Sequence, residues 1–106
     1  MTFQEFQKQN CNYDCITTFW EDFTIAEHFG TWAVQDTFDT ALTEWKHDYK
    51  YITELAIVLN HKCWMHHFLK NEALSDLYSN LFYKTRDFAC KNFKGEAFKY
   101  FYKTID

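Results

Sequence analysis

The sequence contains no proline, two glycines, two serines and one arginine among its 106 residues. A sandwich or barrel of many short strands needs frequent turn residues, so this scarcity excludes those folds. Dinucleotide-binding and P-loop proteins need glycine-rich loops that hold phosphate, whereas Gly30 and Gly95 stand alone. Aromatic residues are abundant instead, with 12 Phe, 7 Tyr and 4 Trp. That content is foreign to disordered chains and, at this length, predicts one compact domain over residues 1–106.

Basic residues are missing from much of the N-terminal half, because no lysine or arginine occurs from Gln9 through Trp45. Acids are frequent in the same stretch: Asp14, Glu21, Asp22, Glu27, Asp36, Asp39 and Glu44. Such a segment projects a negative potential and favours a basic partner, although the whole chain has a net charge of only −4. We therefore predict that these acids bind a partner. The alternative is a solvated acidic face without a partner.

Features of a secreted or membrane-spanning chain are also missing from the sequence. The first residues, Met1 to Lys8, lack the apolar core of a signal peptide. The most apolar window, Tyr51 to Leu59, is far too short to span a bilayer. These features predict a cytoplasmic protein, in which the four cysteines are reduced rather than paired in disulfides.

Apolar residues recur at three- and four-residue steps along most of the chain, and the alternation typical of strands is missing. This spacing predicts an all-α fold, a compact single-domain bundle of about three long helices with short helices at the ends. The long helices are expected after Thr31 as an N-cap, from Ile52 and from Leu74. Polar runs at His47–Asp48 and Lys70–Asn71 are the expected breaks between them.

Shorter helices are predicted at residues 3–9, 24–30 and 96–102, and Gly30 and Gly95 are expected to end the helices that precede them. The helix from Ile52 is apolar nearly all round, which predicts that it is the most buried one. The predicted core contains Phe19, Trp20, Phe29, Trp32, Phe38, Trp45, Trp64, Leu77 and Leu81. Several tyrosines must lie outside this core, and exposed rings beside acids are typical of protein interfaces.

Cysteines and histidines have a spacing that suits a metal ion. Cys63 and His67 are four positions apart and share one face of a helix, and Cys11 and Cys15 have the same spacing. Zinc favours thiolate and imidazole ligands, so these four residues predict a structural zinc site without an open position for catalysis. The alternative is buried cysteines with surface histidines, because the sequence lacks the Cys-x₂-Cys knuckle of common zinc modules.

Groups that could carry catalysis or bind nucleic acid are few. Ser75 and Ser79 lack the glycine-rich elbow of a nucleophilic serine, and Arg86 is the single arginine available for reading bases. We therefore predict a protein without enzymatic activity. Two alternatives stay open. One is a metal-dependent enzyme or redox protein that uses Cys63, His66 and His67. The other is a helical regulatory protein that works as an oligomer.

The run Phe23–Gly30, together with Tyr49–Tyr51, Thr53–Leu55 and Thr104–Asp106, resembles small uncharacterised proteins from phages and mobile elements of gut bacteria. The resemblance covers about residues 19–106 and implies a cytoplasmic accessory protein of a phage. By analogy, such small, acidic, aromatic-rich proteins resemble type II anti-CRISPR inhibitors, which bind the basic nucleic-acid channels of defence nucleases such as Cas9. Some of these inhibitors carry a structural zinc. The analogy implies an inhibitor that blocks a basic surface of a host protein and contacts neither nucleic acid nor membrane.

Overall fold

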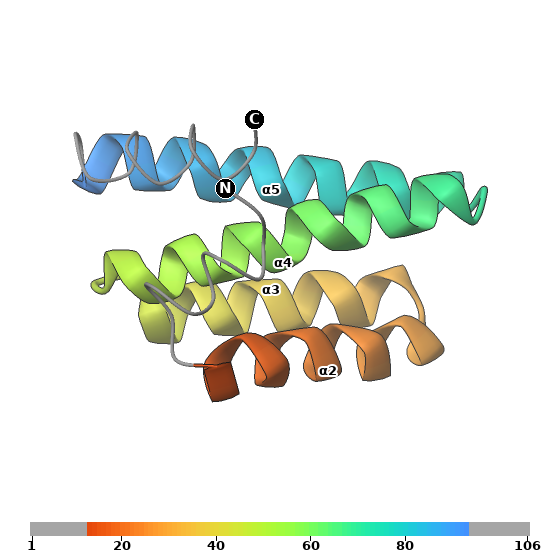
Figure 1. The fold of residues 1–106 in the computed structure, drawn as a ribbon, viewed down its shortest axis with the longest axis horizontal. Coiled ribbons are helices and arrows are strands. Elements are labelled where there is room, and N and C mark those ends of the chain that lie inside the picture. Colours follow the sequence, from red (N-terminus) through yellow and green to blue (C-terminus); the bar gives the residue numbers. More distant parts are fainter. Residues whose placement is uncertain (1–12, 94–106) are drawn as a thin grey trace.

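The computed structural model describes residues 13–93, which form helices joined by short turns and contain no strand. The helices are α2 (Tyr13–Phe29), α3 (Thr31–Trp45), α4 (Tyr49–Phe68) and α5 (Glu72–Phe93) (Figure 1). This part of the chain confirms the all-α fold class. The predicted helices at residues 3–9 and 96–102, and the predicted helix end at Gly95, lie outside the described residues.

Consecutive helices of the bundle run in opposite directions because the turns between them are short. α4 makes its most extensive contact with α5, and α2 packs against both α3 and α4. Since α3 also contacts α5, the helices surround a shared core. The turn between α2 and α3 and the turn between α4 and α5 lie at the same end of the bundle (Figure 1).

The prediction that the helix from Ile52 is the most buried one is confirmed. Residues 52–59 of α4 are all buried, including Thr53 and Glu54. A run of this length covers every face of a helix, because one turn takes about 3.6 residues. None of the described helices combines the length and the apolar character needed to cross a membrane.

Both predicted breaks between helices are confirmed, and each ends at a capping residue. The carboxylate of Asp48 accepts a hydrogen bond from the backbone N–H of Lys50 at 2.9 Å, directly before α4. Oδ1 of Asn71 accepts one from the backbone N–H of Leu74 at 3.2 Å, at the start of α5. These side chains satisfy N–H groups that have no partner within the helix, so they define where each helix begins.

α2 corrects the prediction of a short helix at residues 24–30, because it begins at Tyr13 and has 17 residues. Phe19, Phe23 and Ala26 are buried on one face of this helix. Additional apolar residues between them hide the helical spacing in the sequence. The described part of the bundle therefore has four helices, with α2 longer than the sequence indicated.

Gly30 forms the whole turn between α2 and α3, which confirms that it ends a helix. Its N–H donates to the Ala26 carbonyl at 3.2 Å, and its own carbonyl accepts from the Ala33 N–H at 3.2 Å. Its φ of +130° is a conformation that favours glycine. Because Gly30 itself occupies the N-cap position of α3, Thr31 is the first helical residue and not the predicted N-cap.

Candidate functional site

A groove with a volume of about 600 Å³ lies between α2 and α3. Ala26 of α2 and Ala33 and Ala41 of α3 line it and are buried. Because alanine side chains are short, the space between the two helices is left open above them. The described residues that line the groove all lie between positions 18 and 45, within the stretch without lysine or arginine.

Large apolar side chains stand exposed along the groove. Ile25 and Phe29 are four positions apart on α2, and Trp32 follows at the start of α3. Phe29 and Trp32 are each 68% exposed, which corrects their predicted place in the core. They line the side of the α2–α3 pair that no other described helix covers. The Trp32 indole N–H donates to the Phe29 carbonyl at 3.2 Å, so its ring is held in place.

Phe19, Phe38 and Leu81 are buried as predicted, and Trp20, Trp45 and Leu77 are partly buried against the core. Trp64 is a further correction, since it is 55% exposed on α4. Its ring packs edge-on against His67, with centroids 5.6 Å apart. Exposed aromatic side chains are typical of residues that carry the binding energy of protein interfaces.

Three of the predicted partner-binding acids line the groove: Asp22 on α2, and Asp36 and Glu44 on α3. The pKa of Asp22 is raised, first by partial burial and then by the negative charges of Glu21 and Glu44. No cation stands among the described residues that line the groove. The groove therefore combines an apolar surface with carboxylates that repel one another, and a bound cation would relieve that repulsion.

The other predicted partner-binding acids differ in their placement. Glu21 is exposed next to Asp22. Asp39 is exposed on α3, and its carboxylate accepts a hydrogen bond from Gln35 at 3.1 Å. Asp14 belongs to α2, but its side chain lies outside the described residues.

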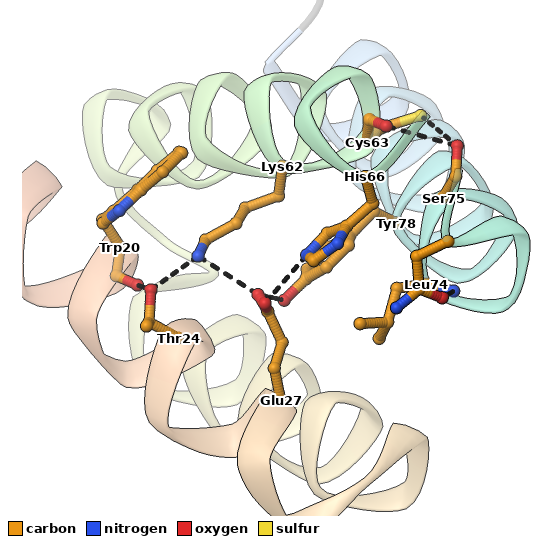
Figure 2. A network of polar contacts seen from close by, with 10 residues as sticks. Trp20, Thr24, Glu27, Lys62, Cys63, His66, Leu74, Ser75 and Tyr78 are labelled. Atoms are coloured by element: carbon orange, nitrogen blue, oxygen red, sulfur yellow. Dashed lines mark hydrogen bonds and ion pairs between the residues drawn. The ribbon is translucent and has the colours of Figure 1, made fainter. Parts of the chain in front are cut away.

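Glu27 is the exception among these acids, because its carboxylate is turned into the bundle (Figure 2). The Tyr78 hydroxyl of α5 donates to Glu27 Oε2 at 2.6 Å, and Lys62 Nζ of α4 lies 3.1 Å from the same oxygen. His66 Nε2, also on α4, lies 2.8 Å from Glu27 Oε1. These contacts use both of its oxygens inside the protein, so Glu27 differs from the exposed acids, and its role in partner binding stays a prediction.

Lys62 supplies the positive charge that balances Glu27, although its side chain is only 1% exposed. Its ammonium group lies 4.1 Å from the centre of the Trp20 ring and donates to the hydroxyl of Thr24. Burial lowers the pKa of Lys62, while the hydrogen bond and charge of Glu27 oppose that shift. The network therefore joins α2 to α4 and α5, and it fixes one wall of the groove.

Sequence reasoning missed this network, although a signal was present. Lys62 and His66 continue the three- and four-residue spacing of the buried Leu55 and Leu59. Glu27 lies four positions after the buried Phe23. Charged residues at core spacing indicate a buried pair, because an unpaired buried charge is very costly.

The structure describes the side chains of only two of the four predicted zinc ligands. Cys63 is partly buried, with its Sγ 3.7 Å from the Ser75 hydroxyl, and His67 is exposed. Cys11 and the side chain of Cys15 lie outside the described residues. Within residues 13–93, no group of three or more His, Cys, Asp or Glu side chains is placed to hold a metal ion. The four-residue zinc site stays a prediction.

Comparisons with protein-family models, with curated proteins and with solved structures found no match for this chain.

Proposed function

We propose that this protein has no enzymatic activity and works by covering a basic surface of another protein with the groove between α2 and α3. The observation that carries this proposal is the composition of the groove. Both of its walls come from one stretch without lysine or arginine, and three carboxylates stand there beside exposed apolar side chains. An apolar centre supplies binding energy, and the surrounding charge selects a partner of opposite sign.

The resemblance to phage proteins of gut bacteria suggests which protein the groove binds and where in the cell it does so. An inhibitor of the anti-CRISPR type would act in the cytoplasm of the host bacterium and block the basic channel of a defence nuclease such as Cas9. A channel that holds nucleic acid carries clustered lysine and arginine, which are complementary to Asp22, Asp36 and Glu44. A zinc ion held by the four predicted ligands would have a structural role.

Charge reversal in the groove tests the proposal. We expect the triple variant Asp22→Lys, Asp36→Lys and Glu44→Lys to lose inhibition of DNA cleavage by purified Cas9, because lysines would then face a basic surface. The matched control reverses three exposed acids of α5, with Glu72→Lys, Asp76→Lys and Asp87→Lys, and changes the net charge equally. The control should keep inhibition, and circular dichroism should show that both variants fold.

Equal loss of inhibition in the two variants would assign the effect to net charge rather than to the groove. A wild-type protein that leaves Cas9 cleavage unchanged at low salt would exclude Cas9 as the partner. Binding that is insensitive to salt would contradict a charge-selected interface, since a Debye length of about 8 Å at physiological salt screens exposed charges.

A further inference from the structure

We infer that the groove takes an amphipathic α-helix of the partner, with two cations placed about two helical turns apart. This inference rests on the proposed function and names the kind of segment that the site accepts. Helices that lie in grooves are a recurrent mode of recognition, in which an apolar face enters the groove and charged residues meet its edges.

The shape of the groove favours a helix. It extends along α2 from Thr18 to Phe29, which corresponds to roughly 16 Å at 1.5 Å per residue. That length accommodates about three turns of a bound helix. The small side chains of Ala26, Ala33 and Ala41 allow a third helix to approach α2 and α3 closely, since axes of packed helices lie about 8–10 Å apart.

An extended segment would fit this site poorly. Residues 13–93 offer no strand edge that could pair with its backbone. An extended chain laid on apolar side chains would bury N–H and C=O groups without partners, and each such group costs about 1–3 kcal/mol. A helix satisfies these groups internally and presents only its side chains to the groove.

The carboxylates of the groove set the spacing of the two cations. Asp36 and Glu44 are eight positions apart on α3, which places them about 12 Å apart along its axis. Two turns of a bound helix cover about 11 Å, so cations at i and i+7 match this separation. Asp22 lines the same groove and lies close enough to Glu44 for the charge of Glu44 to raise its pKa. A cation that meets Glu44 would therefore also be attracted by Asp22.

The apolar side chains define what stands between the two cations. Ile25, Phe29 and Trp32 line the same groove as the carboxylates and are each more than half exposed. Leucine, isoleucine or phenylalanine at i+3 and i+4 of the bound helix would lie on the face shared with i and i+7. The complementary segment therefore carries lysine or arginine at i and i+7 with apolar residues at i+3 and i+4.

Three synthetic peptides of equal length test this inference directly. The first carries lysines at i and i+7 and leucines at i+3 and i+4 in an alanine-glutamine background. The second has the same residues, with its second lysine moved from i+7 to i+5, and the third has a proline in place of one alanine near its centre, which breaks the helix. Binding is measured by calorimetry at low salt, with Trp32→Phe and Asp36→Lys variants to locate the contact.

We expect the first peptide to gain helicity on binding and to bind at least about tenfold more tightly than the other two. The Asp36→Lys variant should weaken it, whereas Asp76→Lys on α5 should not. Equal affinities of the three peptides, no binding of any, or a bound peptide without helicity would each overturn the helix inference. If groove reversal still abolished binding of a protein partner, the proposed function would stand without the helix. If groove reversal left that binding unchanged, the proposed function itself would fail.

Discussion

At the scale of single residues, the carboxylate of Glu27 governs how α2 is held in the bundle. It accepts from Tyr78, and it lies within ion-pair distance of Lys62 and His66, so its removal would leave a buried ammonium group without its anion. A buried ion pair of this kind adds little stability compared with an apolar pair of the same volume. Removing one partner, however, leaves an unpaired buried charge and is strongly destabilising. Its contribution is therefore the fixed position of α2 rather than a large gain in free energy.

We expect Glu27→Ala to lower the free energy of unfolding by about 3–5 kcal/mol, because Lys62 would stay buried and unpaired. The double variant Glu27→Leu with Lys62→Met should recover part of that loss, because it removes both charges but leaves Tyr78 and His66 without the carboxylate that they contact. Urea unfolding followed by circular dichroism measures both quantities. A loss below about 1 kcal/mol for Glu27→Ala would show that Lys62 finds water or another partner in the variant.

Asp22 is expected to affect both the stability of the fold and the proposed binding. Burial, Glu21 and Glu44 raise its pKa, so the ionised carboxylate costs folding free energy at neutral pH, and that cost is relieved as the pH falls through the raised value. We expect Asp22→Asn to stabilise the protein slightly at pH 7, by less than about 1 kcal/mol because only a small part of the group is buried. The gain should shrink near pH 4, and thermal unfolding at the two pH values measures it.

The same Asp22→Asn variant should bind a basic partner more weakly than the wild type. Asp76→Asn, an exposed acid of α5, is the matched control and should change neither stability nor binding. A variant that is more stable and binds equally well would separate the charge of Asp22 from the function of the groove.

At the scale of elements, the sequence predicts where helices are interrupted better than which face they bury. The polar runs around Asp48 and Asn71 indicate both breaks, because these side chains cap the helices that follow. The exposure of Phe29 and Trp32 could not be read from spacing, since periodicity shows that a helix has an apolar face but not whether a neighbour covers it.

The candidate site could also be predicted only in part from the sequence. The stretch without basic residues located the acidic surface, and Asp22, Asp36 and Glu44 do line one groove. The alanines that open the groove carry no signal of their own, because alanine is common in helices of every kind. Glu27 could not be separated from the exposed acids without its partners on α4 and α5, which lie 35 to 51 positions further along the chain.

Gly30 controls the angle between α2 and α3, and Gly30→Ala should therefore disturb the groove. Its φ of +130° is strained for any other residue, and the added Cβ would lie 3.2 Å from the Trp32 ring. We expect a loss of at least about 1 kcal/mol in unfolding free energy and a shift of the Trp32 environment in fluorescence. Thr31→Ala, an exposed neighbour, is the control and should have a small effect on both. An unchanged unfolding free energy for Gly30→Ala would mean that the turn adopts another conformation.

At the scale of the whole molecule, a zinc ion held by Cys11, Cys15, Cys63 and His67 would tie the N-terminal segment to α4. If that site exists, purified protein contains about one zinc per chain, and a chelator lowers the unfolding temperature. Elemental analysis of the wild type and of Cys63→Ala measures this. Cys90→Ala, which changes a partly buried cysteine outside the predicted set, is the control and should retain the metal. Purified wild-type protein that contains no zinc, and whose unfolding temperature a chelator does not change, would contradict the zinc site.

The network around Glu27 also has a consequence for how this sequence can diverge. A change at position 27 alone, or at position 62 alone, leaves a buried charge, whereas a joint change of the whole network to apolar residues would leave none. Positions 27, 62, 66 and 78 should therefore vary as a set in distant homologues, either all polar or all apolar. In an alignment of such homologues, correlated substitution at these four positions would be the mark that the network leaves on the sequence.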